Sequence, residues 1–179
     1  MSESLGRKVE AALVVVVPEA EPLVGRFRAK YDPVAASGVP AHITINYPFL
    51  PGVEPTAVTL DKLSQLFGGV APFSFTLDHV GRFPNSVYLA PVPAIPFIEL
   101  IKQVASEFPE SPPYGGVFDS MIPHLTVAYA NDGVLLASIE HDFSNSASRH
   151  LPIDSFANNI LLLDDSTGRW ETRASFALG

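Results

Sequence analysis

The sequence contains no cysteine among its 179 residues. A disulfide framework, a cysteine-ligated metal site and a thiol nucleophile are therefore excluded. Long apolar runs are scarce as well, and the longest, residues 11–17, falls far short of the ~20 residues that a membrane helix needs. The segment before it has neither the basic start nor the small-residue cleavage site of a signal peptide. We expect no membrane partner and a cytoplasmic location.

Positive charge is also in short supply, because 11 Lys and Arg stand against 19 Asp and Glu, a net charge of -8 at pH 7. Proteins that hold long nucleic acids need basic surface to neutralise phosphates. The sequence therefore argues against a long nucleic-acid tract as partner. A small anionic ligand or a single RNA end remains compatible with it, since a local site can oppose the global charge.

Apolar residues, by contrast, are abundant. They make up 47% of the chain, and charged residues 17%, which is enough to build a sizeable core. No polar linker long enough to separate independent domains interrupts the sequence. We expect a single domain over residues 1–179, acting as a monomer.

The order of sequence patterns predicts an α+β fold. Residues 11–17 form a β-branched run typical of a buried central strand, which Pro18 ends. A helix, a loop rich in Pro and Gly, and a short strand then follow twice along the chain. This repetition predicts two pseudo-symmetric lobes of mainly antiparallel sheet, with outer helices and a central cleft. The expected helices are 19–31, 55–68, 95–108 and 133–143, and the expected strands 11–17, 42–45, 73–77, 87–90, 124–127, 151–163 and 170–176.

One six-residue pattern occurs twice, as His-Ile-Thr-Ile-Asn-Tyr at 42–47 and as His-Leu-Thr-Val-Ala-Tyr at 124–129. Side chains alternate between the two faces of a strand, so His42 and Thr44 share a face while Ile43 points the other way. If the two strands face one groove, two imidazoles and two hydroxyls surround one point.

That set of groups suits a phosphodiester. A neutral imidazole can take a proton from water, a protonated one can give a proton to the leaving oxygen, and hydroxyls can hold the phosphate oxygens. This chemistry needs no metal or cofactor, and neither a His-Glu-x-x-His motif nor a carboxylate-flanked histidine pair lies near the motifs.

The sequence thus resembles the 2H phosphoesterase superfamily, specifically the 2′-5′ RNA ligase family, whose signature is two His-x-Thr/Ser-x motifs. Pro48-Phe49 after the first motif, the early buried strand and the closing strands with Trp170 extend the resemblance. It implies a bilobal fold and a metal-independent cyclic phosphodiesterase or related RNA-end activity. By motif position, His42 and His124 correspond to the catalytic histidines, and Thr44 and Thr126 to the phosphate-binding hydroxyls.

Further residues near the motifs are candidates for binding substrate. Phe49, Phe83 and Tyr88 could stack on a nucleobase, because aromatic faces bind bases without positive charge. Arg82, which follows Gly81 at an expected strand end, could reach a phosphate through its guanidinium. Core packing is the alternative for the aromatic residues, and a plain surface position is the alternative for Arg82.

The remaining histidines and the motif tyrosines are interpreted as structural. Tyr47 and Tyr129 stand at odd offsets from the histidines, which in a regular strand places them on the opposite face, in the core. His79 falls in register with neighbouring apolar positions and is expected to be buried and hydrogen-bonded. His141 and His150 have no repeated context.

We therefore expect hydrolysis of a 2′,3′-cyclic nucleotide, or of an RNA end carrying a cyclic phosphate, to one monoester. Ligation through a 2′-5′ linkage is the same chemistry in reverse, and which histidine is acid and which base stays open. The main alternative is a non-catalytic module that binds a nucleotide or nucleotide sugar in the same cleft, and a weaker one is a purely structural α+β protein.

Overall fold

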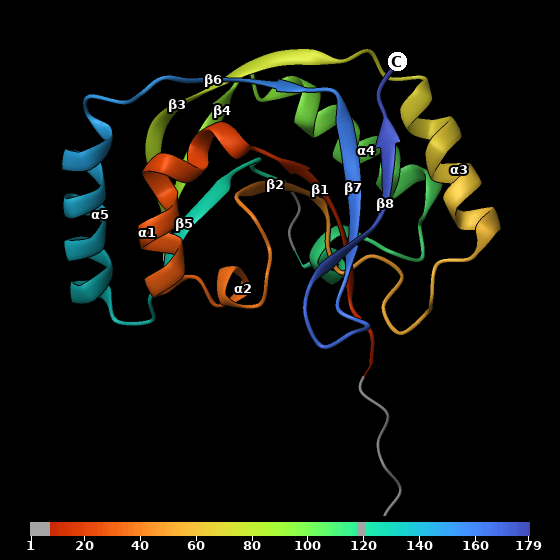
Figure 1. Ribbon diagram of the computed structural model, residues 1–179, viewed down its shortest axis with the longest axis horizontal. Coiled ribbons are helices and arrows are strands. Elements are labelled where there is room, and N and C mark those ends of the chain that lie inside the picture. The colour runs from red at the N-terminus through yellow and green to blue at the C-terminus, as the bar shows by residue number, and fades with distance from the viewer. Residues whose placement is uncertain (1–7, 118–120) are drawn as a thin grey trace, which may run out of the picture.

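The computed structural model describes residues 8–117 and 121–179 (Figure 1). Their strands form one curled antiparallel sheet, in the order β6-β3-β4-β5-β2-β1-β7-β8. The strands are β1 (Ala11–Val16), β2 (His42–Asn46), β3 (Phe73–Phe83), β4 (Ser86–Val92), β5 (Leu125–Tyr129), β6 (Ile153–Ala157), β7 (Asn159–Asp164) and β8 (Glu171–Ala177). The helices are α1 (Glu21–Tyr31), α2 (Pro33–Ala36), α3 (Ala57–Gly68), α4 (Ile95–Glu107) and α5 (Gly133–Ala147), with 3₁₀ turns at Pro18–Ala20 and Pro113–Gly116.

The sheet divides into two four-stranded halves that meet where β2 pairs with β5, at Ile43 and Leu125. Helices α1 and α5 pack on the β5 half, and α3 and α4 pack on the β2 half (Figure 1). The α+β fold with two antiparallel lobes and outer helices is therefore confirmed. Each half of the sheet packs against a helix that follows a strand of the other half. Helix α1 follows β1 but packs on β5, and α4 follows β4 but contacts β2.

Strand β1 is buried from Ala11 to Val15, as the apolar run predicts, and Val16 is partly buried. Leu13 and Val15 enter the main core beneath the helices. Ala12 and Val14 belong instead to a second apolar cluster, which includes Leu163 of β7. One face of β1 thus packs in the main core, whereas the other face, with Ala12 and Val14, lines the cavity described below.

The predicted single strand 151–163 is wrong. The structure divides it into β6 and β7 around Asn158, and β6 pairs with β3 in the other lobe. Only β7 and β8 form the closing hairpin. Helix α5 is also longer than predicted, since it continues past Phe143 to Ala147, and both residues are buried.

Candidate functional site

The two histidines of the repeated motif line one cavity of about 210 Å³. His42 is the first residue of β2, and His124 immediately precedes β5. Because β2 and β5 are hydrogen-bonded neighbours, the two motifs lie next to each other at the junction of the lobes. Thr44 and Thr126, two residues further along each strand, line the same cavity.

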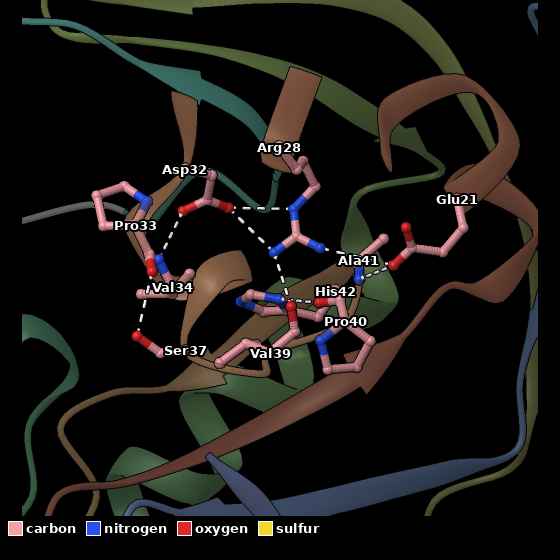
Figure 2. A network of polar contacts seen from close by, with 10 residues as sticks. All are labelled: Glu21, Arg28, Asp32, Pro33, Val34, Ser37, Val39, Pro40, Ala41 and His42. Carbon is pink, nitrogen blue, oxygen red and sulfur yellow. Dashed lines mark hydrogen bonds and ion pairs between the residues drawn. The ribbon is translucent and has the colours of Figure 1, made fainter. Parts of the chain in front are cut away.

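Both imidazoles are held by the same backbone contact. Nδ1 of His42 lies 2.7 Å from the carbonyl oxygen of Pro40 (Figure 2), and Nδ1 of His124 lies 2.7 Å from that of Ile122. A carbonyl oxygen can only accept, so Nδ1 carries the hydrogen in each ring. Nε2 of each histidine is therefore the nitrogen left for proton exchange.

Burial makes both imidazoles weaker bases than an ordinary histidine. Burial, together with the smaller effects of the positive charges of Arg28 and His124, lowers the pKa of His42 to about 4, although the Pro40 carbonyl opposes the change. Burial likewise lowers the pKa of His124, and the Ile122 carbonyl opposes the change. Both rings are consequently neutral at pH 7 in the absence of an anion.

The tyrosines of the two motifs also line the cavity, so the prediction that Tyr47 and Tyr129 lie in the core is wrong. A β-bulge in each motif explains the difference. Leu13 and Val14 pair with Asn46 and Thr44, which leaves Ile45 extra, and Val87 and Tyr88 pair with Ala128 and Thr126, which leaves Val127 extra. One extra residue reverses the alternation of side chains. The tyrosines therefore return to the face of the histidines.

Aromatic rings form the wall of the cavity beside β2. The ring of Tyr47 lies 6.5 Å from that of Tyr114 and 6.3 Å from that of Trp170, measured between centroids. The Tyr47 hydroxyl donates to Glu10 at 2.7 Å, and Thr44 hydrogen-bonds with the Tyr114 side chain. Burial raises the pKa of both tyrosines, and together with the neighbouring Glu10 it raises the pKa of Tyr47 to about 12, so both hydroxyls keep their protons.

Sequence reasoning missed Glu10, Asp32 and Tyr114 as cavity residues. Tyr114 lies in a Pro- and Gly-rich loop, and its backbone N–H donates to the Tyr47 carbonyl at 2.6 Å. Its φ of 50° is in the left-handed region, which is unusual for a residue other than glycine. The Pro and Gly composition predicted the loop, but no periodic pattern could indicate that it folds back over the motif.

Phe83 and Tyr88 pack against the second histidine. Their rings stack at 4.4 Å, and they lie 5.0 Å and 5.5 Å from the His124 ring. Gly81 faces Tyr88 on the neighbouring strand, and a Cβ there would lie only 2.3 Å from the ring. Glycine is thus required for Tyr88 to lie across β3 and support His124.

Two of the predicted substrate-binding residues lie elsewhere. Phe49 has no exposed surface and packs edge-on against Phe108 in the core, so it cannot stack on a base. Arg82 bonds to Glu140 of α5 at 3.0 Å and to the Gly133 carbonyl at 3.4 Å. Arg82 follows Gly81 in β3, so its side chain points to the opposite, helix-covered face of the strand. The predictions that Phe49 and Arg82 bind substrate are therefore wrong.

The other histidines do not line the cavity. The prediction of a buried His79 is wrong, because a register shift at Asp78 places its side chain in solvent. His141 bonds within α5 to Asn145, and His150 bonds to the Ser146 carbonyl.

Within residues 8–117 and 121–179, no cluster of three or more His, Cys, Asp or Glu could hold a metal ion. No helix of the described residues is long and apolar enough to cross a membrane.

Comparison with known proteins identifies the family of the chain. Residues 16–158 match the model of the 2′-5′ RNA ligase superfamily. A Bacillus cereus protein named as a phosphoesterase is 29% identical over 163 residues, which are 85% of this chain and 86% of that protein.

The fold is similar to that of known structures as well. Escherichia coli LigT, crystallised with 3′-AMP, has a TM-score of 0.62 at 22% identity, over 94% of this chain and 97% of LigT. TT0787 of Thermus thermophilus has a TM-score of 0.58 at 18% identity, over 94% of this chain and 97% of that protein. On the strength of the family match over most of its length, the chain belongs to the 2′-5′ RNA ligase superfamily.

Proposed function

We propose that this protein is a metal-independent phosphodiesterase that hydrolyses 2′,3′-cyclic phosphates of nucleotides or RNA ends. The observation that carries the proposal is the pair of histidines in one cavity, each with Nδ1 tied to a backbone carbonyl and Nε2 left for proton exchange. Two neighbouring imidazoles provide a base and an acid for one displacement at phosphorus.

In the proposed reaction, water attacks the phosphorus while the neutral imidazole takes one of its protons at Nε2. The protonated imidazole gives its Nε2 proton to the ribose oxygen as the phosphorus–oxygen bond breaks. The products are a phosphate monoester and a free ribose hydroxyl, and proton exchange with solvent restores both rings. Thr44 and Thr126 donate to the phosphate oxygens that gain charge in the transition state.

Substrate binding favours protonation of the imidazole that acts as acid, and the proton comes from solvent. Both pKa values are depressed in the empty cavity, so protonating one imidazole is unfavourable there. A phosphodiester anion between the rings favours a positive charge on one of them. The pair can thus reach the required state, one neutral and one protonated, with substrate bound.

The lining of the cavity favours a nucleotide with a single phosphodiester charge. Tyr47, Tyr114 and Trp170 offer aromatic faces for a base or ribose. Among the described residues that line the cavity there is no lysine or arginine, whereas Glu10 and Asp32 are present. LigT, which shares the fold, was crystallised with 3′-AMP, one of the two monoesters that adenosine 2′,3′-cyclic phosphate can yield.

The test is a metal-free assay with 2′,3′-cyclic mononucleotides, 2′-5′-linked dinucleotides and ADP-ribose cyclic phosphate, followed by ³¹P NMR in EDTA. We expect conversion of the cyclic mononucleotides to one monoester at an undiminished rate in the chelator. Loss of turnover in EDTA, with recovery on adding a divalent cation, would reject the metal-independent mechanism.

The same assay decides against a module that only binds nucleotides in the cleft. Such a module would bind the cyclic nucleotide without consuming it, and replacing either histidine would change its affinity alone. Turnover that either His→Ala variant lowers by about 10²-fold or more, with binding retained, favours the enzyme.

A further inference from the structure

Behind His42 lies a buried ion pair. Arg28 of α1 is 2% exposed and Asp32, at the start of α2, is 3% exposed. The guanidinium contacts the Asp32 carboxylate through Nη2 at 3.0 Å and through Nε at 3.1 Å (Figure 2). Burial raises the pKa of the Asp32 carboxyl, and the Arg28 charge opposes that rise.

Arg28 and its neighbour Glu21 also hold the backbone segment that leads into β2. Nη2 of Arg28 donates to the Val39 carbonyl at 3.0 Å, and Glu21, 3.6 Å from Nη1 of Arg28, accepts from the Ala41 N–H at 2.6 Å. Between these two anchors stands Pro40, whose carbonyl accepts from His42 (Figure 2). The segment that orients the first imidazole is thus fixed by side chains of α1.

The backbone of this segment has a partner for each of its remaining polar groups as well. The Val39 N–H donates to the Val34 carbonyl, and the Ala41 carbonyl accepts from Val17. Proline has no N–H to satisfy. The position of the Pro40 carbonyl is therefore determined from both sides.

Among residues 8–117 and 121–179, the second copy of the motif has no ion pair in the corresponding place. Its equivalent carbonyl belongs to Ile122, whose side chain is 51% exposed. Among the described residues, no ion pair contacts the segment 121–123 that precedes His124. Phe83 and Tyr88 support His124 instead, by packing on the ring itself.

We propose that Arg28, fixed by Asp32 and Glu21, is a positioning residue for His42: it holds the Val39–Ala41 backbone so that the Pro40 carbonyl keeps the imidazole in the Nδ1–H form with Nε2 toward the substrate phosphate. The proposal rests on the proposed function for its catalytic consequence, but the ring orientation can be measured without any substrate.

Arginine suits this role because its planar fork makes several hydrogen bonds in fixed directions at once. A lysine at position 28 would keep the charge but could not contact Asp32 twice and the Val39 carbonyl together. The charges of Arg28 and His124 act on the His42 ring, and Asp32 and Glu21 in turn pair with Arg28. The Arg28 charge also lowers the pKa of His42, which keeps the ring neutral before substrate binds.

The test uses two changes at the ion pair and one control. Arg28→Lys keeps the charge and loses the fork, and Arg28→Met with Asp32→Leu replaces the pair by apolar side chains of similar size, an exchange that buried ion pairs often tolerate. The control is Arg82→Lys, because Arg82 also bonds one carboxylate and one carbonyl but contacts α5 outside the cavity.

We expect both ion-pair variants to lower kcat by about tenfold or more while KM changes by less than about twofold, since a misplaced ring slows chemistry more than binding. The Arg82→Lys protein should keep the wild-type kcat. In ¹⁵N spectra of the histidine ring, wild-type His42 should be the Nδ1–H tautomer, and the double variant a mixture of both tautomers.

A folded double variant with wild-type kcat and an unchanged His42 tautomer would overturn the proposal. If Arg28→Met/Asp32→Leu does not fold, Arg28→Lys decides by the same two readouts. If the wild-type protein hydrolyses no cyclic phosphate, the proposed function fails, whereas the tautomer comparison still decides the positioning of His42.

Discussion

At the residue scale, the two copies of the motif share their chemistry and differ in their support. His42 and His124 each use Nδ1 to reach the carbonyl two residues earlier, so the same atom is left for proton exchange in both. An ion pair of α1 braces the first copy, and two aromatic rings pack against the second. The near-identity of the two sequences therefore conceals an asymmetric site.

The depressed histidine pKa values predict where the enzyme works. The base must be neutral, so kcat/KM should rise as pH increases through about 4, the pKa of His42. The acid must be protonated, so kcat/KM should fall above the pKa of His124, which lies below the ordinary 6.5. The bell is the same whichever histidine is the base. Initial rates should therefore peak on the acid side of pH 6.5.

The substrate is a suitable probe for that profile, because a cyclic phosphodiester keeps its single negative charge throughout the range. Circular dichroism at each pH serves as the control for folding. A maximum of kcat/KM above pH 7 would contradict the assigned burial of the two rings.

The threonines should contribute through their hydroxyls. Thr44→Val and Thr126→Val keep the side-chain shape and remove the donor. Each should therefore cost about 1–3 kcal/mol of transition-state stabilisation, measured from the decrease in kcat/KM, with little change in thermal stability. The matched control is Ile43→Val on the opposite face of β2. It should cost about 0.5–1.5 kcal/mol of stability and leave kcat/KM unchanged. Wild-type kinetics in both Thr→Val proteins would remove the hydroxyls from the mechanism.

The sequence predicts the residues of the site better than their surroundings. The repeated motif predicts that its histidines and threonines lie together, and they line one cavity: His42, Thr44, His124 and Thr126. The alternation of side chains along a strand is a local pattern, so the sequence alone indicates it. Phe49 could not be placed, since a Phe near a motif looks the same whether it faces a base or the core.

At the element scale, bulges decide which side chains reach the cavity. The extra residues Ile45 and Val127 are apolar and buried, so the sequence reads as uninterrupted alternation and gives no sign of them. A third shift, at Asp78, exposes His79. The presence of a strand could be predicted from the alternation of apolar and polar residues. A bulge that shifts this alternation within a strand depends on the pairing with the neighbouring strand.

Gly81 of β3 tests the support of His124. An alanine Cβ there would lie 2.3 Å from the Tyr88 ring, so the ring must move and the contact with His124 must change. We expect Gly81→Ala to lower stability by about 1–3 kcal/mol and kcat by about tenfold or more. Thermal unfolding and initial rates measure the two effects.

The control for this change is Gly68→Ala at the end of α3, where an added Cβ meets nothing within 4 Å. It should alter neither kcat nor the contacts of His124. A Gly81→Ala protein with wild-type kcat would show that Tyr88 does not position the imidazole.

At the scale of the whole molecule, the active arrangement depends on the junction of two lobes. His42 comes from one half of the sheet and His124 from the other, and in the described part of the chain the two halves of the sheet pair through β2 and β5. Exchange of α1 and α4 between the lobes joins each half to the other's helices. The repeat in the sequence predicted two lobes and a shared cleft. It could not indicate that α1 and α4 pack on the opposite half, or that β6 pairs with β3 in the other half from β7, since both depend on contacts between distant segments.

The central claim is that the two histidines act on one phosphate as a single unit. A double-mutant cycle on 2′,3′-cyclic AMP hydrolysis in EDTA tests it most directly, with His42→Ala, His124→Ala and the double variant. We predict that each single change lowers kcat by about 10²–10⁴-fold, with the fold retained, and that the double variant is hardly slower than either. Independent, multiplicative losses, or a kcat within about tenfold of wild type in either single variant, would contradict the account.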